Sequence, residues 1–469
     1  MTLLERSALD LIELYRTRRA SPVEVTRAAL ERIATLDPVL NAFCFVARDA
    51  ALAAAADSEA RWMNDAPLGP LDGVPVSIKD ILLTKGWPTL RGSRTVDPAG
   101  PWQDDAPAVA RLRESGAVLL GKNTTPEFGW KGVTDSPLTG VTRNPWNPAK
   151  TPGGSSGGGA AAVASGMTPL TLGTDGGGSI RIPCAFTGIF GLKPSFGRVP
   201  AWPLSPFGTV AHIGPMTRTV RDAALLLNTI AQPDARDWFA LPPDGRDYLA
   251  GIDEGVRGWR IAYSATLGYA EVDPEVAAIV GHAAMRFAEL GAEVEEADPP
   301  GLEEVGQVFR RHWFTGAAFL LRNLTAAQKA LVDPGLIQVA DEGSRVGMME
   351  LLEAVQKRGV LGTRMNQFHE RFDLLLTPSL PLAAFDAGRE VADVMKARRW
   401  TDWTPFTYPF NLTQQPAASV PCGLTAAGLP VGLQIVGPRY GDARVLRASR
   451  AFEAAQPFAS PDLSALVSR

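Results

Sequence analysis

The hydrophobic residues change their periodicity near residue 73, and this change sets the expected architecture. From there on, short β-branched runs typical of buried strands alternate with longer stretches whose apolar positions recur every three or four residues, as in helices. The runs expected as strands are 73–80, 116–121, 169–175, 259–265, 292–297, 373–378 and 431–437. The stretches expected as helices are 105–115, 156–166, 218–231, 273–291, 303–320, 344–362 and 441–456. This alternation predicts an α/β fold.

Helical spacing dominates the first 64 residues. Apolar positions between 9 and 15 fall on one helix face. A second helix is announced by Ser21, Pro22 and Glu24, because the serine can cap the helix, proline suits its first turn and the glutamate completes a capping box. We therefore expect a helical N-terminal arm that packs on the main body.

The composition and the net charge restrict the kinds of molecule that this chain is expected to bind. The chain of 469 residues is 45% hydrophobic and 20% charged, with a net charge of -4 and no basic block in either half. Such a chain has no electrostatic footprint for nucleic acid or for an anionic membrane, so the expected partner is a small molecule. We find neither the pattern of a signal peptide nor an uninterrupted apolar run of about 18 residues, and expect no membrane span.

Three cysteines occur, Cys44, Cys184 and Cys422, far apart in the sequence and without C-x-x-C spacing. This pattern indicates neither a disulfide framework nor a zinc site and fits a reducing cytoplasm. Of the four histidines, only His212 lies in a glycine–proline loop, where pairing with a serine remains open; none has metal-ligand spacing. We expect no metal and no cofactor.

Two glycine-rich segments, 151–166 and 173–181, carry the strongest local signal. Neither contains the lysine that a P-loop needs, no strand precedes "GGSSGG" as a dinucleotide fingerprint requires, and "AAAVASG" enters a helix, unlike a flexible linker. A serine nucleophile with a lysine base remains, since lysine can accept a proton once burial lowers its pKa. Lys79 in "GVPVSIKD" follows a short apolar run, although a surface lysine paired with Asp80 is the competing interpretation.

Four motifs together resemble those of the amidase signature family. They are "LDGVPVSIKD" at 71–80, the block from "TPGGSSGGG" to "GLKPS" at 151–195, "GPMTRTVRDAA" at 214–224 and "GLPVGLQIVGPR" at 428–439. The resemblance covers nearly the whole chain. It implies a single α/β/α domain over residues 1–469 with a mixed, twisted central sheet covered by helices on both faces. Within it we expect the arm at 1–64, the signature core at 65–230, and at 231–469 the rest of the sheet and the elements of the substrate pocket.

The resemblance also implies hydrolysis of a carbon–nitrogen bond by a Ser-Ser-Lys triad. In that arrangement Ser179 is the nucleophile, Ser155 the proton shuttle and Lys79 the base, and the peptide bond between Gly154 and Ser155 is cis. Glycines at that bond permit a backbone approach that a β-carbon would block. Lys79 then acts in its neutral form, and an acyl-enzyme forms on Ser179.

The remaining site residues belong to the second glycine-rich turn and to a wall of apolar side chains. The backbone N–H groups expected to stabilise the oxyanion are those of Gly176, Gly177, Gly178 and Ser179. Supporting positions are Ser156, Asp175 and Arg181, of which the last two are expected to pair across the turn. The candidate residues of the substrate pocket are Phe128, Trp130, Ile182, Trp400, Trp403 and Phe406.

Because no cluster of arginine or lysine indicates an anionic substrate, we expect a neutral aryl or alkyl amide, with anilides and carbamates in range. We expect a monomer or a homodimer. One alternative is the glutaminase-like subunit of a tRNA-dependent amidotransferase, from which the segment 203–219 departs because it lacks the Ser-Leu-Asp-Gln run typical of that branch. The other alternative is a binding protein that keeps the fold without activity.

Overall fold

The computed structural model describes residues 2–392 and 397–467 of the chain, and within them eleven strands form one sheet. In sheet order the strands are β1 (Phe43–Val46), β3 (Val118–Asn123), β2 (Pro75–Lys79), β6 (Leu170–Asp175), β8 (His212–Thr217), β7 (Phe190–Lys193), β12 (Ala417–Leu424), β13 (Pro430–Val436), β11 (Leu374–Pro378), β9 (Arg260–Tyr263) and β10 (Glu293–Glu296). The sheet is mixed, as expected: β2 runs parallel to both β3 and β6, whereas β8 is antiparallel to β6 and β7. A separate hairpin pairs β4 (Asp135–Ser136) with β5 (Gly140–Val141).

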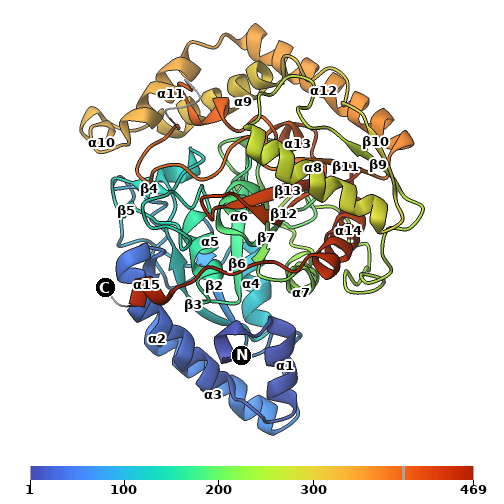
Figure 1. Ribbon diagram of the computed structural model, residues 1–469. Helices are drawn as coiled ribbons and strands as arrows, with labels where there is room; N and C mark the ends of the chain where they lie inside the picture. Colours follow the sequence, from blue (N-terminus) through green and yellow to red (C-terminus); the bar gives the residue numbers. More distant parts are fainter. Residues whose placement is uncertain (1, 393–396, 468–469) are drawn as a thin grey trace.

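Helices surround this sheet (Figure 1). They are α1 (Ala8–Arg16), α2 (Pro22–Leu40), α3 (Arg48–Met63), α4 (Pro107–Glu114), α5 (Gly157–Ala164), α6 (Arg181–Thr187), α7 (Val220–Ile230), α8 (Pro274–Glu289), α9 (Val305–Leu321), α10 (Ala326–Lys329), α11 (Pro334–Ser344), α12 (Met348–Arg371), α13 (Pro409–Leu412), α14 (Asp442–Ala455) and α15 (Ser464–Val467). In Figure 1, α2 and α3 lie at one end of the molecule, and α9, α11 and α12 gather at the opposite end. None of these helices has the length and apolar character needed to cross a bilayer, within the described residues.

The predicted elements are confirmed at the level of type and approximate position. Every run expected as a strand overlaps one, and every stretch expected as a helix overlaps one. The capping box of α2 forms as predicted: Glu24 N–H donates to Ser21 Oγ at 3.2 Å, and Ser21 N–H donates to Glu24 Oε2 at 2.9 Å. The hydrophobic period therefore placed these elements correctly.

The N-terminal arm differs from the prediction, because it is not purely helical. Strand β1 lies between α2 and α3 and pairs with β3 at the edge of the main sheet. The sequence pattern also missed β7, β8 and β12, whose glycines and prolines, such as Pro215 and Pro421, resemble loop sequence. Pairing with neighbours on both sides makes strands of these segments despite their composition.

Strand β6 shows how the two faces of the sheet are covered. Leu170 and Leu172 are fully buried in the same hydrophobic cluster as the residues of α7. Thr171 points to the other face, where a β-carbon on Gly159 of α5 would lie 2.9 Å from its Oγ1. Helices thus pack on both faces, and α5 sits directly above the strand that leads into the second glycine-rich turn.

Candidate active site

Three segments that are far apart in sequence meet where the parallel strands β2 and β6 end. Ile78 of β2 is in register with Leu172 of β6, so the carboxyl ends of both strands reach the same edge of the sheet. Lys79 is the last residue of β2, Ser179 lies in the turn that follows β6, and Ser155 lies in the loop before α5. Their exposed fractions are 1%, 5% and 2%.

Lys79 contacts two hydroxyl groups. Its Nζ donates to Ser155 Oγ at 2.7 Å and to Thr174 Oγ1 at 2.8 Å. Burial lowers the pKa of Lys79 well below its ordinary value, and the attraction of Asp175 opposes this only in part. Among the described residues no carboxylate forms an ion pair with Lys79, so burial favours its neutral form, which has the lone pair that a base needs.

The loop that carries Ser155 has the backbone expected from its glycines. The Gly154–Ser155 peptide bond is cis, which confirms the prediction for this bond. Gly153 has a φ of +78°, and a β-carbon on Gly154 would lie 2.4 Å from the backbone carbonyl of Val133. A side chain at Gly154 does not fit, so this approach of two backbones requires glycine.

Ser156 connects the loop of Ser155 to the turn of Ser179. Its N–H donates to the Ser179 carbonyl at 3.1 Å. Its Oγ donates to the Thr174 carbonyl at 3.2 Å and accepts from the Thr174 N–H at 3.3 Å. These bonds fix the spacing between the two serine-bearing segments.

Asp175 and Arg181 pair across the turn, as predicted. Arg181 donates from Nε to Asp175 Oδ2 and from Nη2 to Asp175 Oδ1, both at 2.9 Å, and both side chains are fully buried. Burial alone would raise the pKa of Asp175, but the charge and hydrogen bonds of Arg181 hold it below its ordinary value. The guanidinium also donates to the Thr407 carbonyl, to Gln434 Oε1 and to Asn411 Oδ1.

The second glycine-rich turn differs from the prediction at one of its donors. The N–H of Gly178 donates to Asp175 Oδ1 at 2.7 Å, so the carboxylate and not an oxyanion occupies it. Among the described residues, the N–H groups of Gly176, Gly177 and Ser179 have no acceptor. The carboxylate of Asp175 therefore shapes the turn, and the three remaining N–H groups are the ones free to bind a developing negative charge.

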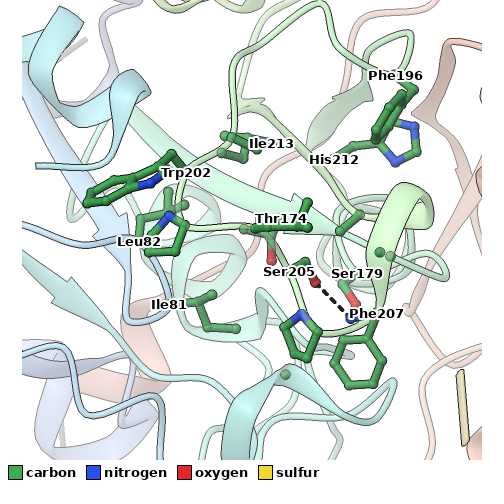
Figure 2. Close-up of a pocket in the computed structure, with 18 of the residues that line it drawn as sticks. Ile81, Leu82, Thr174, Ser179, Phe196, Trp202, Ser205, Phe207, His212 and Ile213 are labelled. Atoms are coloured by element: carbon green, nitrogen blue, oxygen red, sulfur yellow. Dashed lines mark hydrogen bonds between the residues drawn. The ribbon is translucent and has the colours of Figure 1, made fainter. Parts of the chain in front are cut away.

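A cavity of about 200 Å³ opens above these residues. In Figure 2, Ser179 and Thr174 lie at its centre, with Ile81 and Leu82 on one side and Phe207 on the other. Ser155 and Gly176 also line it, so the hydroxyl groups and a free N–H of the turn face one mostly apolar space.

Comparison with known proteins agrees with this geometry. A model of the Amidase family matches residues 24–446. The chain belongs to the amidase signature family. As an amidase, it hydrolyses carbon–nitrogen bonds, and the alternative of a binding protein without activity is wrong.

The relatives of this amidase include acylamidases and amidotransferase subunits. An acylamidase of Rhodococcus erythropolis is 37% identical over 97% of this chain and 96% of its own length. One subunit of the glutamyl-tRNA(Gln) amidotransferase of Myxococcus xanthus (strain DK1622) is also 37% identical, over 98% of this chain and 99% of its own. The crystal structure of a bacterial aryl acylamidase of the amidase signature family superposes with a TM-score of 0.90, at 35% identity over 99% of this chain and 98% of that chain.

Of the six predicted wall residues, the structure places one on the cavity and five away from it. Phe128 lines the cavity. The others are fully or almost fully buried in a hydrophobic cluster and do not line it; they are Trp130, Ile182, Trp400, Trp403 and Phe406. These large apolar side chains pack against other core residues, because packing there removes their apolar area from water.

The buried tryptophans still act on the site through packing. Trp403 stacks on Phe186 with ring centroids 6.0 Å apart. Trp400 packs behind the glycine turn, where a β-carbon on Gly177 would lie 2.8 Å from its ring. The ring of Trp400 thus packs against the backbone of the turn from the side away from the cavity.

His212 lines the cavity but makes no hydrogen bond to a serine among the described residues, and Cys184 lies in a hydrophobic cluster of the core. The His212 Nδ1 lies 2.8 Å from the Val210 carbonyl and 3.2 Å from the Asp175 carbonyl, and burial lowers its pKa well below the ordinary value. Cys184 is fully buried, and burial raises its pKa. Within the described residues, no group of three or more histidine, cysteine or acidic side chains could hold a metal ion.

Sequence reasoning missed three features of the cavity. Thr174, which contacts Lys79, lies inside a strand and resembles any β-branched strand residue. The loop 195–213 supplies much of one wall, and its proline and glycine content was the available signal. Arg91 also lines the cavity, but it is a single arginine with no pattern around it.

Proposed function

We propose that this amidase hydrolyses a neutral aryl or alkyl amide, with anilides and carbamates in range, through an acyl-enzyme on Ser179. The observation that carries the proposal is the contact of 2.7 Å between Lys79 Nζ and Ser155 Oγ at the floor of the cavity that Ser179 also lines. A buried neutral amine in contact with a hydroxyl group forms the base and shuttle that a serine nucleophile requires.

In the first half of the reaction, Lys79 accepts the hydroxyl proton of Ser155, and Ser155 takes the proton of Ser179. The Ser179 oxygen then forms a bond to the substrate carbonyl carbon, and the carbonyl π electrons move to its oxygen. This step requires the Ser179 hydroxyl to reach Ser155 Oγ when substrate is bound. The N–H groups of Gly176, Gly177 and Ser179 stabilise the oxyanion.

In the second half, the tetrahedral intermediate collapses and the carbon–nitrogen bond breaks. The proton on Lys79 returns through Ser155 to the leaving nitrogen, which departs as an amine. Water then attacks the ester on Ser179 with the same relay as base, and the acid is released. Returning the proton is essential, because an amide anion is a very poor leaving group.

The apolar walls support the choice of substrate class. Ile81, Leu82, Phe128 and Phe207 line the cavity next to the two serines. An aryl or alkyl group bound there is removed from water, and this burial stabilises the complex by about 25 cal/mol per Å² of apolar area. The acylamidase and aryl acylamidase relatives carry names of the same class.

A second candidate is the glutamine-hydrolysing component of an amidotransferase, which the relatives with that name favour. Such a component works with partner chains, so its glutaminase activity should depend on them. We propose instead that this chain acts on a small-molecule amide without nucleic acid, as a single domain, as a monomer or homodimer, in the cytoplasm. Glutamine hydrolysis that appears only with added amidotransferase partner chains would reverse this choice.

The test is turnover of a panel of anilides, aliphatic amides, esters, carbamates and glutamine by the purified protein. We expect anilide hydrolysis to fall about 10²- to 10⁴-fold in Lys79→Ala and at least as far in Ser179→Ala. The matched control is Ser449→Ala, whose buried hydroxyl bonds within α14 away from the cavity. Full turnover by Ser179→Ala would overturn the mechanism, and a panel without any amide turnover would overturn the substrate class.

A further inference from the structure

Arg91 is a charged residue of the cavity wall that the proposed mechanism does not use. It is half-buried and lines the same cavity as Ser155 and Ser179. No side chain or carbonyl among the described residues accepts a hydrogen bond from its guanidinium. By contrast, every nitrogen of the buried Arg181 guanidinium donates to an acceptor. Arg91 therefore has five N–H donors available to a molecule in the cavity.

No carboxylate among the described residues forms an ion pair with Arg91. The nearby carboxylate of Asp80 lies 3.4 Å from Lys122 Nζ, and these two buried groups form an ion pair with each other. Burial lowers the pKa of Arg91 and the attraction of Asp80 raises it, but a guanidinium stays protonated in proteins. The carboxylate of Asp237 also lines the cavity, where it accepts hydrogen bonds from the backbone N–H groups of Ala201 and Phe239, and it forms no ion pair with Arg91. The guanidinium of Arg91 is thus left to pair with a ligand.

The position of Arg91 in the cavity wall indicates which half of the substrate it faces. Its carbonyl accepts from the Phe128 N–H at 2.7 Å, and the next residue, Gly129, packs on the shuttle: a β-carbon there would lie 3.2 Å from Ser155 Oγ. Arg91 and Phe128 therefore belong to the wall beside Ser155. In the proposed mechanism Ser155 returns the proton to the leaving nitrogen, so this wall faces the amine half of the substrate.

We propose that Arg91 binds a carboxylate carried by the amine half of the substrate. The inference rests on the proposed function and deepens it: neutral amides are the minimal substrates, and amides of aromatic or alkyl amino acids are the preferred ones. A guanidinium binds a carboxylate through two parallel N–H···O bonds, which are short and charge-assisted. In a cavity with apolar walls such a pair is weakly screened by water, so it selects strongly between an acid and its neutral analogue.

The test compares two matched anilides, 4-acetamidobenzoate and 4-methylacetanilide, which differ in one group on the amine half. The measured quantity is the ratio of their kcat/KM values in the parent, Arg91→Gln, Arg91→Lys and Arg371→Gln, the last removing a charge of an exposed arginine of α12. Intrinsic differences in amide reactivity cancel when ratios are compared between proteins. We expect the ratio to fall about 10- to 100-fold in Arg91→Gln, less in Arg91→Lys, and not in Arg371→Gln.

A binding measurement separates this inference from the proposed function. The product 4-aminobenzoate is titrated into the parent and Arg91→Gln by calorimetry, which needs no chemical step. Its Kd should rise about 10- to 100-fold in the variant. If neither anilide is hydrolysed, the proposed function fails, and this titration still decides the role of Arg91.

Three outcomes would overturn the inference. Equal ratios of kcat/KM in the parent and Arg91→Gln would show that the arginine does not select acids. Equal binding of 4-aminobenzoate would show the same without catalysis. An Arg91-dependent preference for succinanilate, which carries its carboxylate on the acyl half, would contradict the assignment to the amine half.

Discussion

Lys79 Nζ donates a hydrogen bond of 2.7 Å to Ser155 Oγ, and neither residue is more than 2% exposed. Asp175, the carboxylate that attracts the lysine, accepts hydrogen bonds from Arg181 and Gly178. Among the described residues, the lysine is paired with hydroxyl groups and forms no ion pair. This relationship predicts how activity and stability respond to pH and to substitution.

The first prediction concerns the pH dependence of activity. The proposed mechanism needs neutral Lys79, whose pKa burial lowers well below 10.5. We therefore expect kcat/KM for an anilide to rise with pH along a limb centred well below 10.5, and expect Lys79→Ala to lose that limb. The check is a pH–rate profile of both proteins. A limb centred at the ordinary lysine pKa would contradict a neutral base.

The same group predicts a pH dependence of stability. Between the lowered pKa of Lys79 in the folded chain and 10.5 in the unfolded chain, the unfolded state binds the extra proton. The free energy of unfolding therefore increases as the pH rises through this window and decreases as the pH falls through it. Urea unfolding at several pH values should show that Lys79→Met removes this contribution. Parallel curves for parent and variant would disprove it.

Thr174 is expected to position the base. Its Oγ1 accepts from Lys79 Nζ at 2.8 Å, and its backbone is tied to Ser156. Thr174→Val keeps the shape and removes the acceptor, so kcat should fall about 2- to 10-fold. Thr174→Ser should restore kcat and the position of the pH limb. A valine variant with unchanged kcat and an unchanged pH profile would show that the contact is incidental.

The Asp175–Arg181 pair is expected to hold the turn together. Asp175→Asn leaves the fully buried Arg181 without its counterion, and we expect a loss of about 3–5 kcal/mol in the free energy of unfolding. The control is Glu289→Gln, which breaks an exposed pair with Arg286 and should change stability by about 0–1 kcal/mol. Denaturant titrations of the three proteins measure both values. Equal losses in the two variants would refute a special role for the buried pair.

The cavity wall and the core should respond differently to loss of an aromatic ring. Phe128 lines the cavity, so Phe128→Ala should lower kcat/KM for anilides about tenfold. Trp403 is fully buried in the core, so Trp403→Ala should lower the free energy of unfolding by about 3–5 kcal/mol. Phe319→Ala, on an exposed ring, serves as control for both assays. If Trp403→Ala kept the free energy of unfolding of the parent and lowered kcat/KM for anilides, the assignment of Trp403 to the core and not to the cavity wall would be wrong.

The agreement between sequence and structure is closest where local chemistry decides the outcome. The capping box of Ser21 and Glu24 needs only two nearby residues, and it formed as predicted. The glycines 153 and 154 indicated an unusual backbone, which is cis at the following bond. These features depend on residues a few positions apart, which a sequence displays directly.

The disagreements arise where a residue's role depends on distant partners. Strand β1 pairs with β3 across more than seventy residues, and no local period indicates it. Trp400 lies near the C-terminal end of the chain but packs behind Gly177, which makes it a support and not a wall. The same holds for Arg91, whose free guanidinium is visible only when the cavity is closed by other segments.

The sequence by itself indicated most of the helices, seven of the strands, the family resemblance and the candidates Lys79, Ser155 and Ser179, because periodicity and motif order are properties of the chain. Only the tertiary structure decided which N–H groups of the turn stay free. Asp175 occupies that of Gly178, since its carboxylate is buried against Arg181 and needs donors there. Which acceptor pairs with a buried N–H group depends on the distances between residues in the folded chain, and a sequence does not contain those distances.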